Sequence, residues 1–303
     1  MAHGAGARSC PPGLAGQVGV ISRERDRSPR RRVPGSDRAS AASRGGDAEN
    51  PKGRELSSWP AFVADNTGLR GIPLPSKPLI VHSAFTGLGS HAKVLDELCI
   101  PFIDAFSCDP KGSAVDWMRE NHCLATHHYA TLRQVIDGQG DCATCGGHCD
   151  SRRRDTRSVD LFFAGFCCQP YSKQARSGKT PQEHPLWYTT TETIEYVQRL
   201  KPRAFILENT LGFLVIREYE EGKPATSGYK WLKGCLPEYV VQCMELDLKR
   251  WVSISRPRVW IVGIRRDVGT QAAANAVRGL ATDVEEARAE QVPDRVERYM
   301  FQK

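Results

Sequence analysis

Short apolar runs alternate with amphipathic stretches between residues 79 and 264, and this alternation predicts most of the fold. Runs rich in branched and aromatic residues predict buried strands, whereas apolar positions at three- and four-residue spacing predict helices. The predicted strands are 79–81, 101–109, 159–164, 204–207, 239–246 and 259–264, and the predicted helices are 91–98, 113–121 and 191–200. This order predicts an α/β fold with a doubly wound, mostly parallel sheet that ends in an antiparallel closing strand.

The segments outside this region are polar. Residues 1–58 are rich in Gly, Pro, Ser, Ala and Arg, and such a segment buries too little apolar surface to offset its ordering entropy. We therefore expect a disordered basic tail and linker over 1–73, a folded domain over 74–267 and a helical tail over 268–303. The run RERDRSPRRR at 23–32 is either a solvated tail or a nuclear-targeting arm that contacts nucleic acid.

Composition narrows the class of protein. The net charge of +7 suits a nucleic-acid partner without requiring one. The 11 cysteines form no regular framework in a chain of 303 residues, which favours a reducing compartment over a disulfide scaffold. No apolar run approaches the roughly 18 residues that span a bilayer, and the first residues lack the apolar core of a secretory signal. We expect a nuclear or otherwise cytoplasmic protein that is not secreted and has no membrane partner.

A glycine-rich turn follows the first predicted strand. Gly87, Gly89 and Ala92 have the spacing G-x-G-x-x-A at the start of a helix, where small residues let the backbone approach a ligand. Asp109 ends the next strand, where a carboxylate accepts hydrogen bonds from a ribose. Both NAD and S-adenosylmethionine carry such a ribose, so the turn alone leaves an oxidoreductase, a methyltransferase and a ligand-free turn open.

Three further motifs lie at strand ends. DLFFAGFCCQPYS (160–172) places two thiols just past a buried strand, at the sheet edge where α/β proteins bind ligands. ILENT (206–210) places Glu208 at the end of another buried strand, where partial desolvation favours the protonated carboxyl group. SRPRVWIVG (255–263) places Arg256 and Arg258 on one face at strand spacing, an arrangement that suits phosphate or carbonyl oxygens.

FTGLG, GFCCQPYS, ENT and SRPR occur in this order, and together they resemble the C5-cytosine DNA methyltransferase family over roughly residues 79–267. The resemblance implies a Rossmann-like methyltransferase fold, S-adenosylmethionine as cofactor and DNA as partner, or RNA, since one branch of the family modifies tRNA. It makes residues 74–267 the catalytic domain and leaves the oxidoreductase as a minor alternative. A second alternative is an inactive homologue that binds S-adenosylmethionine or DNA.

The resemblance also implies catalytic roles. Cys168 matches the family nucleophile, whose thiolate attacks carbon 6 of cytosine. Cys167 stands where the family usually has proline, so this loop is expected to be less rigid. Glu208 would contact cytosine N3, Arg258 the base carbonyl and Arg256 a nearby phosphate.

The cofactor site implied by the resemblance comprises Phe85, Gly87, Gly89, Asp109 and the neighbouring Cys167. The sequence departs from the family pattern at three further places: Ser83 replaces an acid, no acid stands near Tyr129 or Ala130, and Ile254 replaces a glutamine. Only residues 267–303 follow the SRPR strand, and they show no target-recognition region. A truncated product, a partner chain and an inactive homologue are the three explanations.

Residues 121–149 combine cysteines and histidines, namely Cys123, Cys142, Cys145, His148 and Cys149. The spacing Cys142-x-x-Cys145 is typical of one half of a zinc site. Without a second clear pair, we expect a polar loop with incidental thiols and no metal, and the sequence leaves zinc open.

Overall fold

The computed structural model describes residues 75–121, 124–150, 158–172, 180–220, 222–250, 255–268, 271 and 273–279. All of them belong to one compact unit, Leu56–Lys303. The predicted tail 1–73, with its basic run at 23–32, lies outside the described residues, so the nuclear expectation stays a prediction. The same holds for residues 280–303, whereas residues 273–279 form a helix as expected.

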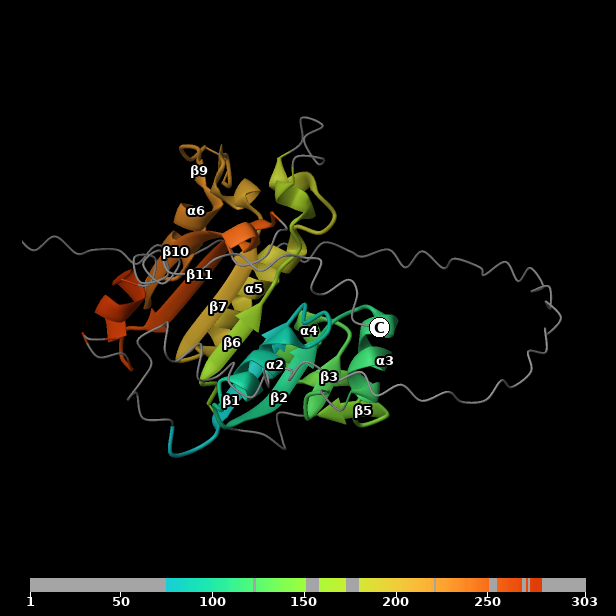
Figure 1. Ribbon diagram of the computed structural model, residues 1–303. Coiled ribbons are helices and arrows are strands. Elements are labelled where there is room, and N and C mark those ends of the chain that lie inside the picture. The colour runs from blue at the N-terminus through green and yellow to red at the C-terminus, as the bar shows by residue number, and fades with distance from the viewer. Residues whose placement is uncertain are drawn as a thin grey trace, which may run out of the picture. The chain divides into compact units, whose positions relative to one another are not determined.

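One sheet of nine strands organises the described part of the chain, in the order β10-β11-β7-β6-β1-β2-β3-β4-β5 (Figure 1). The strands are β1 (Leu79–Ala84), β2 (Phe102–Cys108), β3 (His127–Tyr129), β4 (Gln139–Cys142), β5 (Gly147–Asp150), β6 (Leu161–Ala164), β7 (Ala204–Asn209), β10 (Tyr239–Asp247) and β11 (Pro257–Arg265).

The pairing confirms the predicted Rossmann-like topology. β1 pairs in parallel with β2 on one side and β6 on the other, and β2–β3 and β6–β7 are parallel as well. β11 runs antiparallel to both β7 and β10, so it is the predicted closing strand. Strand order reverses at β1, and open α/β sheets bind ligands at such a switch point, beyond the carboxyl ends of the strands.

The helices and short elements that connect the strands are α2 (Ser90–Glu97), α3 (Gly112–Glu120), α4 (Leu132–Asp137), α5 (Tyr188–Leu200), α6 (Gly228–Cys235), the 3-10 turns η1 (Gln169–Tyr171), η3 (Pro181–Glu183), η4 (Leu211–Leu214) and η5 (Leu248–Arg250), and a two-stranded ribbon of β8 (Ile216–Arg217) and β9 (Thr226–Ser227). Local signals fix their ends. Thr131 and Gln134 form a capping box at the start of α4, and Gly138 ends that helix in the left-handed conformation.

Aromatic side chains dominate the core. Tyr196 of α5 stacks on Phe162 of β6 with ring centroids 3.9 Å apart, and its hydroxyl lies 2.6 Å from His82 Nδ1. Phe205 of β7 fills the space beside Gly263, where a Cβ atom would stand 2.2 Å from the ring. These contacts fix α5 against β1 and β6 and fix β11 against β7, the strands that carry the candidate site.

The expected polar loop over 121–149 is wrong, because the structure places β3, α4, β4 and β5 there. β3 has only three residues, His-His-Tyr, and the β4–β5 hairpin is polar, so neither gives an apolar run. β1 also extends past Val81, because His82 and Ser83 are buried despite their polarity.

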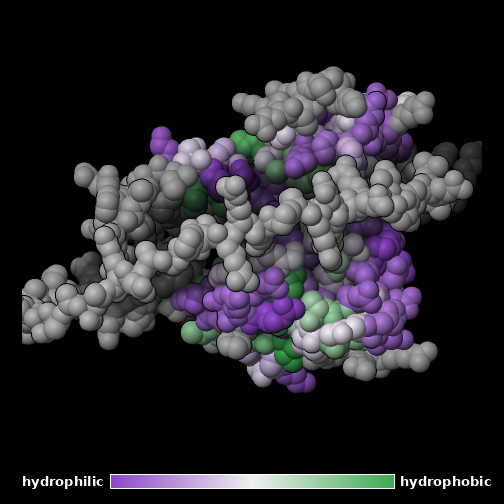
Figure 2. Space-filling view, turned by 90° about the vertical axis from the view of Figure 1, so that its right-hand side faces the viewer, coloured by the Kyte–Doolittle hydropathy of each residue, from purple (hydrophilic) through white to green (hydrophobic). Residues whose placement is uncertain are grey.

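The coloured residues of the face seen in Figure 2 are mainly hydrophilic, with hydrophobic residues in small groups. Scattered apolar side chains are normal on a protein surface. No helix within the described ranges is long and apolar enough to span a membrane.

Candidate active site

The carboxyl ends of four parallel strands bring the motifs together. β1 leads to Phe85, β2 to Asp109, β6 to the loop Gly165–Cys168, and β7 carries Glu208 near its end. Because these strands are neighbours in the sheet, the residues that follow them share one edge (Figure 1). The fold therefore brings the residues that follow these strands to one edge of the sheet.

Cys168 immediately precedes η1, and it is held there through the backbone. Its carbonyl accepts the Tyr171 N–H at 3.0 Å. Tyr171 is fully buried and its hydroxyl lies 2.8 Å from Thr190 Oγ1. Gly212 packs against the same turn so closely that a Cβ atom would stand 1.9 Å from the Tyr171 carbonyl oxygen. The turn after Cys168 is thus fixed by packing, while the Cys168 side chain itself is partly exposed.

Cys167 is tied to α5 through an interaction that proline could not make. Its N–H donates to Thr189 Oγ1 at 3.2 Å, and that hydroxyl donates to the Leu186 carbonyl at 2.8 Å. The hydrogen bond restores part of the rigidity that the absent proline would supply. Burial raises the pKa of the Cys167 thiol, and the Gln169 N–H acts against this rise. Cys167 therefore has the properties of a supporting thiol more than of a nucleophile.

Glu208 and Arg258 form an ion pair, with Arg258 Nε 2.6 Å from Glu208 Oε1. Their side chains are 26% and 21% exposed, so the pair is largely shielded from solvent. The other carboxylate oxygen, Oε2, faces the nucleophile loop, since a Cβ atom on Gly165 would stand 3.5 Å from it. The sequence predicted Glu208 and Arg258 as separate site residues and missed the ion pair between them.

Arg256 lies directly before the start of β11. Its N–H donates to Asp247 Oδ1 at 2.7 Å, and the Ser255 hydroxyl donates to Asp247 Oδ2 at 2.8 Å. The Arg256 side chain is exposed. Arg258 is paired with Glu208 and Arg256 is exposed, while the strand face that the two arginines were expected to share stays a prediction.

The glycine turn and Asp109 form one structure. Phe85, Gly87 and Gly89 all have positive φ, of 55°, 55° and 74°. The buried Asp109 carboxylate accepts the Gly87 N–H at 2.9 Å on one oxygen and the Lys111 N–H at 2.9 Å on the other. Each oxygen keeps a lone pair, and a Cβ atom on Gly87 would meet nothing within 4 Å. The turn therefore has an open side next to a carboxylate.

A cavity of about 540 Å³ lies beside Asp109, and Tyr129 and Ala130 line it. This volume is in the range of small-molecule sites. His128 lines the cavity too, and its buried Nε2 has no hydrogen-bond partner among the described residues. Burial lowers the pKa of His128, which favours the neutral ring. These features fit a ligand that carries an adenosine, and Tyr129 and Ala130 stand where the family's acid is absent.

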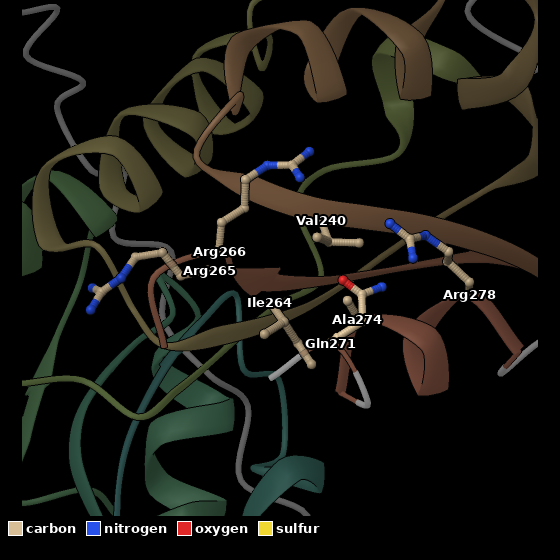
Figure 3. Close-up of a pocket in the computed structure, with 7 residues that line it drawn as sticks. All are labelled: Val240, Ile264, Arg265, Arg266, Gln271, Ala274 and Arg278. Carbon is tan, nitrogen blue, oxygen red and sulfur yellow. The ribbon is translucent and has the colours of Figure 1, made fainter. Parts of the chain in front are cut away.

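A second cavity, of about 110 Å³, lies far from these residues (Figure 3). It is lined by Val240, Ile264, Arg265, Arg266, Gln271, Ala274 and Arg278. Ile264 pairs with Ala204 at the start of β7, the end opposite to Glu208. The three arginine side chains extend in different directions, so they do not converge on one ligand.

The structure also gathers four side chains that the sequence did not combine. Ligand atoms of His127, Cys142, Cys145 and Cys149 all lie within 4.8 Å of one another. His148, the histidine considered from sequence, is exposed on the other side of β5 from the buried Cys149. Cys123 lies outside the described residues.

A profile described as C-5 cytosine-specific DNA methylase matches residues 142–300, which include the CCQP, ENT and SRPR motifs. No curated protein sequence matches. Among 217 matching chains of known structure, one is described as a DNA modification methyltransferase encoded within a prophage, from E. coli. It is 14% identical with a TM-score of 0.44, and the match covers 63% of this chain and 47% of that chain.

The chain spans less than half of that solved structure. The family assignment rests on the family profile alone. The profile covers more than half of the 303 residues. Its match includes Cys168, Glu208 and Arg258, which the fold places at the carboxyl edge of the sheet. The chain therefore belongs to the C-5 cytosine-specific DNA methylase family.

Proposed function

We propose that this protein transfers a methyl group from S-adenosylmethionine to carbon 5 of cytosine in DNA, through a covalent adduct with Cys168. The observation that carries the proposal is the meeting of the Gly165–Cys168 loop with the Glu208–Arg258 pair. Glu208 Oε2 would lie 3.5 Å from a Cβ atom on Gly165, three residues before the thiol. A cytosine between this loop and Glu208 would be within reach of both.

Cys168 supplies the nucleophile that the reaction needs. Carbon 5 of cytosine is a poor nucleophile, and bonding of the Cys168 sulfur to carbon 6 turns it into an enamine-like carbon. S-adenosylmethionine, when bound, supplies an electrophilic methyl group on a sulfonium. Once carbon 5 carries the methyl group, its proton passes to a water molecule, the Cys168 thiolate leaves carbon 6, and the proton held at N3 returns to Glu208, which restores the aromatic ring. The fixed turn after Cys168 keeps the sulfur in place through these steps.

Glu208 and Arg258 act on the other side of the base. A hydrogen bond between the Glu208 carboxyl group and cytosine N3, with a proton between them, draws electron density from carbon 6 and assists the attack of the thiolate. Arg258 holds the carboxyl group through Oε1, which leaves Oε2 toward the base. The guanidinium of Arg258 has N–H groups beyond those that bind Glu208 and the Pro257 carbonyl, and one of them would bind the base carbonyl.

The remaining predicted site residues would bind the cofactor and the DNA. Phe85, Gly87 and Gly89 form the turn that receives the cofactor, and Asp109 offers its free lone pairs to ribose hydroxyls. The exposed Arg256 is available to a phosphate of the DNA backbone. A base inside a duplex cannot reach Cys168, so the target cytosine must be flipped out, as in other methyltransferases.

The test is a covalent trap. The full chain is incubated with S-adenosylmethionine and duplex DNA that contains 5-fluorocytosine, whose fluorine cannot leave as a proton does. We expect a denaturation-resistant protein–DNA band that Cys168→Ala abolishes and Cys167→Ala retains. A tRNA that contains 5-fluorocytosine, run in parallel, separates the RNA branch. Folded protein that binds S-adenosylmethionine yet traps neither nucleic acid would contradict the proposal and favour the inactive homologue.

A further inference from the structure

We propose that His127, Cys142, Cys145 and Cys149 bind one structural zinc ion at the edge of the sheet. The four ligand atoms converge from three parts of the chain: β3 supplies the histidine, β4 and the turn after it supply two thiols, and β5 supplies the third. Three sulfurs and one imidazole nitrogen are a common ligand set of structural zinc.

The distances match a tetrahedron around one metal ion. The Cys142, Cys145 and Cys149 sulfurs lie 3.9, 3.5 and 3.4 Å from His127 Nδ1, and the Cys145 and Cys149 sulfurs are 3.6 Å apart. Zinc bonds of about 2.3 Å to sulfur and about 2.0 Å to nitrogen give tetrahedral edges of about 3.8 Å between sulfurs and about 3.5 Å between sulfur and nitrogen. One ion at the centre would therefore reach all four atoms with little movement.

The turn between β4 and β5 has the backbone of a metal-binding knuckle. The Cys145 N–H points to Cys142 Sγ at 3.3 Å, and such a donor stabilises a thiolate that binds a metal. Gly146 has a φ of 75° and donates its N–H to the Cys142 carbonyl at 2.9 Å, which brings the chain back toward Cys149. His148, two residues after Gly146, is exposed on β5.

Burial distinguishes this cluster from exposed residues that meet by accident. His127, Cys142 and Cys149 are 5%, 2% and 4% exposed, while Cys145 closes the site on the solvent side. With all four positions taken by protein atoms, no position stays open for a substrate, which makes the site structural rather than catalytic. Zinc binding releases the protons of the three thiols, so its affinity falls as the pH falls.

A disulfide between Cys145 and Cys149 is the main competing arrangement. Their sulfurs are 3.6 Å apart, and all described cysteines are free. A disulfide would use only two of the four converging groups, whereas one metal ion uses all four. Counting the free thiols of the unfolded, unreduced protein separates the two arrangements.

The experiment uses the full chain, purified without oxygen and without added reductant after growth with zinc. Elemental analysis should find about one zinc per chain and no comparable amount of iron. Cys145→Ala should lower the zinc content to near zero, and because Cys145 is exposed the variant should still fold. Cys99→Ala, a second exposed cysteine outside the cluster, and His148→Ala should both keep the full zinc content.

Cobalt provides a readout that does not depend on any variant's folding. Zinc-free protein titrated with Co²⁺ should gain the intense visible bands of tetrahedral cobalt and a thiolate-to-cobalt charge-transfer band, saturating at about one equivalent. His127→Cys should keep the metal and strengthen the charge-transfer band by roughly one third, since four thiolates replace three.

Three outcomes would overturn the proposal. The first is wild-type protein with neither zinc nor a tetrahedral cobalt spectrum. The second is a Cys145→Ala variant that retains the full zinc content. The third is a disulfide that accounts for Cys145 and Cys149 in the freshly purified chain. None of these readouts depends on methyl transfer, so the zinc site and the proposed function fail or stand separately.

Discussion

Two groups of cysteines lie in different surroundings within one sheet. Cys167 and Cys168 follow a parallel strand, and a threonine hydroxyl and backbone groups hold their loop. Cys142, Cys145 and Cys149 lie on an antiparallel hairpin that folds its thiols back onto one histidine. The comparison shows how the backbone positions thiols. The loop after a strand can present one sulfur to a ligand, whereas a tight hairpin gathers several sulfurs around one point.

The largest expected effect on methyl transfer, the reaction proposed for the region around Cys167 and Cys168, is that of Glu208→Gln. Glutamine keeps the shape and an oxygen for Arg258 but cannot share a proton with cytosine N3, so methyl transfer should fall by about 10²- to 10⁴-fold. The zinc content and the thermal unfolding midpoint should not change. Glu238→Gln, at an exposed ion pair with Lys201, is the control and should keep the wild-type rate. A Glu208→Gln rate within about twofold of wild type would remove Glu208 from the mechanism.

Gly212→Ala should act on stability and activity together. The new Cβ atom would stand 1.9 Å from the Tyr171 carbonyl oxygen, a backbone atom that cannot move away without shifting the nucleophile turn. We expect a loss of about 1–3 kcal/mol in the free energy of unfolding, measured by urea denaturation, with slower methyl transfer. Gly234→Ala in α6, whose Cβ atom would have open space, should be neutral or stabilising. Equal stability of the two variants would show that the turn tolerates displacement.

Thr189→Val tests whether a hydrogen bond replaces proline beside the nucleophile. The valine removes the acceptor of the Cys167 N–H and the donor to the Leu186 carbonyl, at a cost of about 1 kcal/mol. Methyl transfer should fall by up to about tenfold, because the position of Cys168 loosens. Thr191→Val, on the exposed face of the same helix, should leave the rate unchanged. Identical rates for both variants would mean that Thr189 does not position the loop.

The smallest expected effect concerns the contact between α4, beside the cysteine hairpin, and α5, beside the Cys167–Cys168 loop. Arg133 of α4, near the cysteine hairpin, binds Glu195 of α5, the helix that carries Thr189, at 2.7 Å from Nη1 to Oε1. The hydrogen bond from Arg133 holds the pKa of Glu195 below its ordinary value of 4.5. This pair therefore contributes stability above pH 4.5, and the contribution is lost as the pH falls through the lower folded pKa.

The size of this contribution is below about 1 kcal/mol, because the pair is partly exposed. Urea denaturation of the wild type and Glu195→Gln should differ near neutral pH and converge in acid. Nearby Glu192 acts in the opposite sense, since burial raises its pKa. For that reason the difference between the two proteins is the quantity to follow. A difference that does not depend on pH would exclude the ion pair as its cause.

The sequence predicted the strands that carry apolar runs, namely β1, β2, β6, β7, β10 and β11. It could not predict that His127 faces Cys142, because 15 positions with an intervening helix separate them and only the pairing of β3 with β4 brings them together. Arg258 and Glu208 were each predicted as site residues, yet their ion pair depends on the antiparallel register that places Trp260 opposite Glu208. Local patterns specify elements, and these two sites arise from register between distant strands.

The hairpin of β4 and β5 joins the rest of the sheet through one ladder pair, Tyr129 with Cys142, and through hydrogen bonds of its turn, such as the Ala143 N–H to the His128 carbonyl at 2.8 Å. If it detached, β3 would become the edge of the sheet and would expose unpaired N–H and C=O groups, which can recruit a strand of another chain. With the hairpin in place the sheet ends instead in β5, a short strand with few apolar side chains. The proposed zinc ion, by joining the turn of this hairpin to His127 of β3, would thus also keep that sheet edge covered.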